Sequence, residues 1–245
     1  MATHALPNKS AELGRKRQEL QYGRKYVWQL PIRLTHWTFA IAIPVLMITG
    51  LLIARPQLSP IGEPFRNFWM GRIREIHFIF AYALTFAIVL RAYWFLAGNN
   101  YARSGVPMFW KASWWKSVLH QMVEYVHLER GHVHIGHNAL AGASYAGFLG
   151  MSVFEAVTGF ALFGEVNKGG FWDRMTGWVV PLLGGSYQTH FWHHAAAWGI
   201  VLFVIFHVYI VIYDAVLYRD GLVDAMFSGF KFYEKGDLDN DKWIS

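Results

Sequence analysis

The sequence contains no cysteine, and only 16% of its 245 residues are charged. The absence of cysteine excludes disulfides, thiolate zinc sites, iron–sulfur clusters held by this chain and covalently attached haem. Any metal must therefore be held by histidine, carboxylate or methionine side chains. The low charge argues against an ordinary soluble domain, in which about a quarter of the residues are charged. The net charge of +6 is not gathered into one region, so it does not indicate nucleic-acid binding.

Long apolar stretches dominate the chain instead. A transmembrane helix needs about 20 mostly apolar residues. Four stretches meet this requirement, at about 36–54, 76–98, 139–164 and 191–213. A further apolar window, 171–185, is short and contains Asp173 and Arg174, which is typical of an interfacial helix. The sequence thus predicts an all-α fold, in which 1–245 form one integral-membrane domain, a four-helix bundle with interfacial helices in the loops.

Lysine and arginine are spread unevenly over the segments outside the spans. Seven lie before the first span, four between the second and third, and four after the fourth. The loop between the third and fourth spans holds only two lysines and arginines. The difference between the two sides of the membrane is weakest at the loop between the first and second spans. By the positive-inside rule, we expect both termini to be cytoplasmic. The chain is then a multi-pass protein of the bacterial inner membrane.

The histidines of the spans occur at matched depths. His36 opens the first span at the inner face, and His77 lies early in the second span at the outer face. His193 and His207 both lie on the fourth span, 14 residues apart, which puts them about 40° apart around the helix and about 21 Å apart along it. Ionisable residues inside a membrane are costly and usually functional. The fourth span therefore offers one histidine at each depth, on one side of the helix.

This arrangement predicts two haem groups, each held by two histidines. The inner pair is His36 and His207, and the outer pair is His77 and His193. Two axial imidazoles leave no open position on the iron, so such a site carries electrons and needs no catalytic residue. The competing interpretation is that these histidines only form hydrogen bonds between helices.

Three further features allow more than one interpretation. His190 and His194 compete with His193 for the outer position. Glu155 in the third span is either a neutral hydrogen-bonded acid or part of a proton path. The third span also has small residues at helical spacing, which indicate either close helix packing or room for a flat macrocycle, namely Ala139, Ala143, Ala146, Gly147 and Gly150.

Two stretches carry a resemblance to a known family. One is Arg-Leu-Thr-His-Trp at 33–37, followed by Leu-Met-Ile-Thr-Gly at 46–50. The other is His-Phe-Trp-His-His at 190–194, with His207 after it. Over about 26–230, the chain resembles the b-type cytochrome subunit of membrane-bound nickel–iron hydrogenases. Thr38 and Glu155 depart from the family pattern, and we expect neither of them to touch the haem ligands.

The resemblance implies a respiratory function. Members of the family anchor a periplasmic hydrogenase of small and large subunits, and they pass electrons from its iron–sulfur chain through an outer and an inner haem b to a quinone. The small subunit would dock on the outer face, around Gly169–Gly185. The quinone would lie near His137, Asn138 and Tyr209, although His137 and Asn138 also fit a cap of the third span. The histidine ligands of the family match His36, His77, His193 and His207.

Three functions compete on these grounds. The first is di-haem electron transfer from hydrogenase to the quinone pool, within the lipid membrane. In that case the chain does not itself activate hydrogen, because it lacks the cysteines of a nickel–iron site. The second is the cytochrome b subunit of a formate dehydrogenase-type complex, against which the hydrogenase-like loop at 169–184 argues. The third is a haem-free transporter in which the histidines relay protons, and it predicts no haem absorbance.

Overall fold

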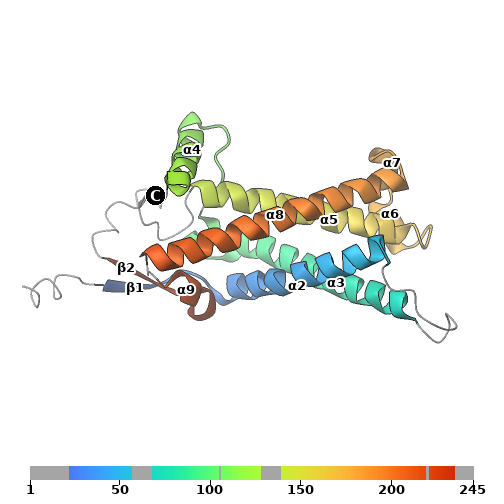
Figure 1. The fold of residues 1–245 in the computed structure, drawn as a ribbon, viewed down its shortest axis with the longest axis horizontal. Coiled ribbons are helices and arrows are strands. Elements are labelled where there is room, and N and C mark those ends of the chain that lie inside the picture. The colour runs from blue at the N-terminus through green and yellow to red at the C-terminus, as the bar shows by residue number, and fades with distance from the viewer. Residues whose placement is uncertain (1–21, 57–67, 105, 128–138, 219–220, 235–245) are drawn as a thin grey trace, which may run out of the picture.

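Four long helices form a bundle along the long axis of the molecule (Figure 1). The computed structural model describes residues 22–56, 68–104, 106–127, 139–218 and 221–234. The bundle helices are α2 (Leu30–Ala54), α3 (Trp69–Ala97), α5 (Ala139–Gly164) and α8 (Ser186–Tyr218). All four are long and apolar enough to cross a membrane. The prediction of an all-α membrane bundle with four spans is therefore confirmed.

Three of these helices begin earlier than the hydropathy pattern indicates. α2 begins at Leu30 rather than near His36, and α3 begins at Trp69 rather than near Ile76; α8 likewise begins before its predicted span, at Ser186. The added turns carry arginine, glutamate and hydroxyl side chains. Hydropathy marks only the stretch that fits the hydrocarbon core, whereas a helix continues into the headgroup region, where polar side chains reach water.

An apolar cluster from all four long helices fills the middle of the bundle. Phe39 of α2 meets Phe148 of α5 edge to face, with ring centroids 5.5 Å apart, and Phe148 stacks on Phe203 of α8 at 4.7 Å. Leu84 and Ile88 supply the contribution of α3. Aromatic pairs of this kind add about 0.5–1.5 kcal/mol each beyond the burial of their area. This layer joins the helices and separates the two ends of the bundle.

The beginning and the end of the described chain meet at one end of the bundle, which we term the sheet end. There β1 (Tyr22–Tyr26) and β2 (Phe230–Glu234) form an antiparallel two-stranded sheet beside α9 (Leu222–Ser228) (Figure 1). Trp37 of α2 donates its indole N–H to the carbonyl of Met226 in α9 at 3.1 Å. This bond ties the last described segment to the first span.

The helix α4 (Ala112–His127) stands across the bundle near the sheet end (Figure 1). The backbone N–H of Leu140, at the start of α5, donates to the side-chain oxygen of Gln121 at 2.9 Å. The hydroxyl of Tyr125 donates to Oδ2 of Asp214 in α8 at 3.1 Å. α4 is thus fastened to two of the four long helices, α5 and α8.

A buried arginine in α3 is stabilised by neighbouring groups. Arg91 is 5% exposed, and its Nη2 donates to the carbonyl of Ala102 at 3.0 Å, within the 3-10 helix η2 (Asn100–Arg103). Its guanidinium lies 5.0 Å from the ring centroid of Tyr145 in α5. A buried charge needs such partners, and a cation facing an aromatic ring is a favourable one. Arg91 therefore joins α3 to α5 instead of breaking the span.

The other end of the bundle, which we term the α6–α7 end, is closed by two short helices. α6 spans Phe171–Thr176 and α7 spans Val179–Leu182 (Figure 1). The sequence predicts one interfacial helix over 171–185, and the structure corrects this to two. The break falls at Gly177, where a Cβ atom would collide with the carbonyl oxygen of Asp173. Glycine avoids this contact with the preceding turn because it has no Cβ atom.

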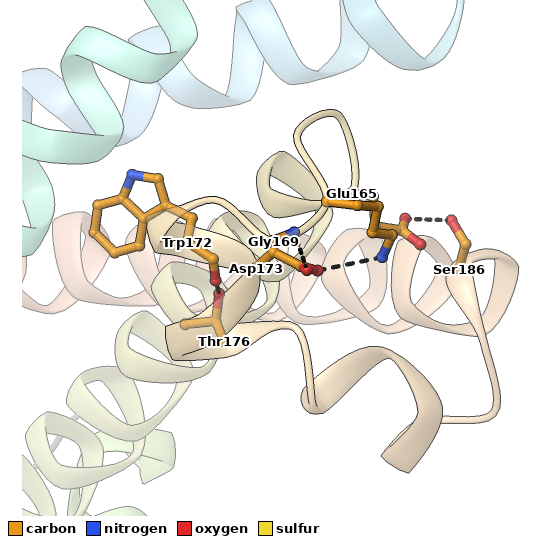
Figure 2. A network of polar contacts seen from close by, with 7 residues as sticks. Glu165, Gly169, Trp172, Asp173, Thr176 and Ser186 are labelled. Atoms are coloured by element: carbon orange, nitrogen blue, oxygen red, sulfur yellow. Dashed lines mark hydrogen bonds and ion pairs between the residues drawn. The ribbon is translucent and has the colours of Figure 1, made fainter.

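Hydrogen bonds fix the loop between α5 and α8 (Figure 2). Ser186 donates to Oε2 of Glu165 at 2.7 Å, which links the start of α8 to the end of α5. The carboxylate of Asp173 accepts the backbone N–H of Gly169 at 2.8 Å and faces the ammonium of Lys168 at 3.3 Å. The Gly169 N–H first, and then Lys168, hold the pKa of the Asp173 carboxyl below its usual range. The charged form of Asp173 therefore stabilises the loop.

Candidate haem sites

The first candidate site lies at the sheet end, between α2 and α8. The rings of His36 and His207 have their centroids 6.3 Å apart. Two imidazoles that share one metal through bonds of about 2.0 Å place their centroids about 6 Å apart. Nδ1 of His36 is buried and has no hydrogen-bond partner among the described residues. The spacing and the unpaired nitrogen both fit a cofactor held between these two rings.

The second candidate site lies towards the α6–α7 end, and α2 orients its first histidine. Nδ1 of His77 lies 2.8 Å from Oγ1 of Thr49. The single hydroxyl hydrogen of Thr49 is donated to the carbonyl of Val45 at 2.7 Å, so Thr49 can only accept from the histidine. Nδ1 must therefore carry the proton of the neutral ring. This tautomer leaves the lone pair of Nε2 free to bind a metal.

The same device recurs at the second histidine, between α5 and α8. Nδ1 of His193 lies 2.9 Å from Oγ1 of Thr158, whose own hydrogen is donated to the carbonyl of Phe154 at 2.7 Å. His193 must donate from Nδ1 as well, and its Nε2 is likewise the nitrogen with a free lone pair. The histidines of α3 and α8 are thus oriented by threonines of α2 and α5.

A glycine follows each of these threonines and gives the histidine ring its space. A Cβ atom at Gly50 would lie 3.4 Å from Cε1 of His77, and one at Gly159 would lie 3.2 Å from Cε1 of His193. The Thr-Gly pairs at 49–50 and 158–159 therefore have the same two roles, one for each histidine. The hydroxyl sets the tautomer, and the missing side chain lets the ring pack against the helix.

Glu155 corrects an expectation drawn from the sequence, which was that it would not touch the haem ligands. Its Oε2 lies 2.9 Å from Nδ1 of His193, and its Oε1 is buried without a partner among the described residues. A signal was available, because Glu155 and Thr158 are three residues apart and so share a helix face. The rotation of α5 about its axis decides which helix this face contacts. That rotation could not be predicted from the sequence pattern.

The two competitors for the outer position are oriented differently. His190 donates from Nδ1 to the carbonyl of Ser186 at 2.9 Å, and His194 donates to the carbonyl of His190 at 2.7 Å. Both acceptors lie one turn earlier on the same helix. Among these three histidines, only His193 has its described Nδ1 partners on another helix, namely Thr158 and Glu155 of α5.

The residues predicted for a quinone site are only partly described. Tyr209 of α8 is 56% exposed and stacks on Tyr213, with ring centroids 6.4 Å apart. His137 and Asn138 lie outside the described residues. The quinone site therefore stays a prediction.

The small residues of α5 include two that border open space. A Cβ atom at Gly147 or Gly150 would meet nothing within 4 Å. Close packing against another described helix is thus not the role of these two glycines, which favours room for a flat group. Among the described residues, no group of three or more acidic or histidine side chains could hold a bare metal ion.

Comparison with known proteins identifies the family. The prokaryotic cytochrome b561 family matches residues 27–229 of this chain. The chain belongs to this family. This membership confirms the resemblance found in the sequence. The protein is therefore a b-type cytochrome of membrane electron transfer, with haem b as its cofactor. The family also argues against a haem-free transporter.

Relatives with a hydrogenase-related description are similar over most of the cytochrome. One from Cupriavidus necator, described as a probable Ni/Fe-hydrogenase B-type cytochrome subunit, is 42% identical over 214 residues, covering 85% of this chain and 87% of that protein. The probable Ni/Fe-hydrogenase 1 B-type cytochrome subunit of Escherichia coli K12 is 36% identical over 88% of this chain and 94% of its own length. A similarly described protein of Bradyrhizobium diazoefficiens is 36% identical over 93% and 95%.

Proposed function

We propose that the cytochrome holds two haem b groups and carries electrons across the membrane from a periplasmic nickel–iron hydrogenase to the quinone pool. The observation that carries this proposal is the occurrence of two histidine pairs at different depths of one bundle. His36 and His207 would hold the haem at the sheet end, and His77 and His193 would hold the other. A haem with two imidazole ligands exchanges single electrons and has no open position for a small molecule.

Neighbouring residues orient the histidines of each pair for binding a haem. At the α6–α7 end, Thr49 and Thr158 keep the Nδ1 proton of each histidine in place, which leaves Nε2 as the metal-binding atom. At the sheet end, Phe203 stacks on His207 with an interplanar angle of 8°. The same Phe203 belongs to the apolar layer between the sites. That layer keeps water and ions away from the path between the two pairs.

We assign the hydrogenase to the α6–α7 end. Relatives of the cytochrome are described as Ni/Fe-hydrogenase subunits. Trp172 of α6 stacks on Phe160 at 3.9 Å and donates to the hydroxyl of Tyr82 at 2.8 Å, so the short helix has a firm support. Exposed apolar side chains on a firm support are typical of a protein contact. Those of this end include Phe171, Met175, Trp178 and Leu182. The small subunit docked here would bring its iron–sulfur chain next to the outer pair.

We assign the quinone to the sheet end, close to the inner pair. Tyr209 lies two residues beyond His207 on α8, and its side chain is exposed. A quinone diffuses within the bilayer, so its site must open towards lipid. The phenol of Tyr209 offers a hydrogen-bond donor for a quinone oxygen. His137 and Asn138 complete the proposed set, before the start of α5.

The orientation that serves this function has the sheet end in the cytoplasm of a bacterium and the α6–α7 end in the periplasm. Lysines and arginines are more frequent in the segments of the sheet end, including Arg24, Lys25 and Lys231. The positive-inside rule places such segments in the cytoplasm. The alternative of a formate dehydrogenase-type complex shares this orientation, but the descriptions of the relatives favour hydrogenase as the electron donor.

The experiment that tests the proposal is a haem count on the purified chain and on single histidine variants. The reduced protein should give a sharp low-spin b-type spectrum, and the pyridine haemochrome should give about two haems per chain, one for each bis-histidine site. His77→Ala or His193→Ala should remove the outer haem. His36→Ala or His207→Ala should remove the inner haem and abolish quinone reduction.

Three results would contradict the proposal in different ways. A single haem in the wild type would leave one of the two sites without function. Loss of the outer haem in His194→Ala, with retention in His193→Ala, would assign the outer position to the neighbouring histidine. Reduction of the haems in membranes by formate, and not by hydrogen, would replace the donor complex.

A further inference from the structure

The two histidines of the outer pair have unequal hydrogen-bond partners. His77 donates to Thr49, whose hydroxyl is neutral. His193 faces the hydroxyl of Thr158 and the carboxyl of Glu155, with both oxygens 2.9 Å from the same Nδ1. The side chain of Glu155 is only 12% exposed. The acid is therefore directed at the histidine and away from solvent.

The direction of this hydrogen bond follows from the threonine. Thr158 has already donated its hydrogen to the carbonyl of Phe154, so the proton shared by the three groups belongs to Nδ1 of His193. Oε2 of Glu155 accordingly accepts. A carboxyl group that accepts the second ring N–H of a metal-binding histidine raises the basicity of that ligand more than a hydroxyl does. It draws the proton away from the ring and makes Nε2 a stronger electron donor.

We propose that Glu155 is a positioning residue that strengthens His193 as an axial ligand and so lowers the reduction potential of the outer haem. This inference rests on the proposed function, because it requires a haem between His77 and His193. A more electron-rich ligand stabilises ferric iron more than ferrous iron, and hydrogen bonding to the ligands is one of the means by which a protein sets a haem potential. The inner pair has no such acid among the described contacts of His36 and His207.

The position of Glu155 suits the direction of electron flow. Electrons that enter at the periplasmic side must move inward, towards the negative side of the energised membrane, and the membrane potential opposes this step. A lower potential at the outer haem compensates for that opposition, because it favours the inner haem as the resting place of the electron. An acid at the outer pair, and not at the inner pair, biases transfer from the donor complex towards the quinone.

The test is a potentiometric titration of both haems in the full chain and its variants. Glu155→Gln keeps the shape of the side chain and replaces the acid by an amide. We expect it to retain two haems and to shift the outer haem towards the ferrous form by at least tenfold, which is about 59 mV for one electron. The inner haem of the same sample is the internal reference. Glu165→Gln is the matched control, because Glu165 follows α5 and bonds only to Ser186 in the described contacts.

Thr158→Val provides a second measurement that does not depend on the glutamine variant. It removes the neutral acceptor and leaves Glu155 at Nδ1, so we expect the potential of the outer haem to stay low. An unchanged outer potential in Glu155→Gln would overturn the inference, and so would a tenfold rise in Thr158→Val. These results leave two haems in place and do not affect the proposed function. Absence of the outer haem from the wild type would overturn both.

Discussion

Thr49 and Thr158, beside the proposed outer haem, each have a single hydroxyl hydrogen to donate. In Thr49 and Thr158 the one hydroxyl hydrogen is donated within the helix, to the carbonyls of Val45 and Phe154. The oxygen is left as a pure acceptor, and a histidine that faces it has no choice of tautomer. Helix geometry thereby determines the protonation of a side chain on another helix. A serine can do the same, whereas a valine of equal shape cannot.

This reasoning predicts the behaviour of substitutions at Thr49. Thr49→Val removes the acceptor of the His77 proton, and we expect a 10–100-fold loss of affinity for the outer haem, as is typical when a partner of a metal-binding histidine is removed. Thr49→Ser should retain most of the affinity. The measurement is haem retained per chain, with the low-spin signal of the outer haem in electron paramagnetic resonance.

A matched control separates the histidine contact from helix packing. Thr85 of α3 donates to the carbonyl of Ala81 at 2.8 Å, as Thr49 does to Val45, but it has no hydrogen bond to a histidine among the described residues. Thr85→Val should therefore keep both haems. Equal haem loss in Thr85→Val and Thr49→Val would mean that the hydroxyl acts only within its own helix.

At the scale of single elements, the sequence predicts the spans better than their partners. Hydropathy identifies four helices because each must satisfy its backbone inside a membrane. The spacing of His193 and His207 also predicts that they serve different depths, since it depends on one helix alone. The contact of Glu155 with His193 depends on how α5 and α8 are rotated and could not be predicted in this way. The sequence also did not predict the division of 171–185 into α6 and α7, which falls at Gly177.

The loop that carries α6 provides a prediction about pH. The pKa of Asp173 is lowered by the N–H of Gly169 and by Lys168, so the folded loop binds the proton of this carboxyl less readily than the unfolded loop does. The contribution of Asp173 is therefore complete above the usual aspartate pKa of about 4, and it is lost as the pH falls through the lowered value. Hydrogen exchange at the Gly169 amide should show protection from neutral pH down to about pH 4 and a loss of protection only below it.

The control for this measurement is Asp173→Asn. The amide side chain does not ionise, so the protection of Gly169 in this variant should be weaker and should not change with pH beyond the intrinsic exchange rate. A protection profile in the wild type that parallels the asparagine variant at every pH would show that the charge of Asp173 does not hold the loop.

At the scale of the whole molecule, the two ends of the bundle are built for different partners. The sheet end joins the beginning and the end of the described chain through β1 and β2, and α9 and α4 are fastened beside it (Figure 1). The α6–α7 end presents apolar side chains on a loop fixed by hydrogen bonds (Figure 2). His36 and His207 face each other near the sheet end, His77 and His193 lie towards the α6–α7 end, and the apolar layer lies between them. Electron transfer in one direction then requires one orientation of this molecule in the membrane.

That orientation can be tested directly because the chain has no cysteine. A single introduced cysteine is the only thiol, so a membrane-impermeant maleimide reports which side it faces. Val166 lies at the α6–α7 end and is 85% exposed, and Ser113 lies on the exposed side of α4 near the sheet end. We expect Val166→Cys to be labelled in intact spheroplasts and Ser113→Cys only after the membrane is permeabilised. The reverse pattern would place the α6–α7 end in the cytoplasm, where a periplasmic hydrogenase could not reach it, and labelling of both in intact spheroplasts would contradict a four-span topology with these two loops on opposite sides.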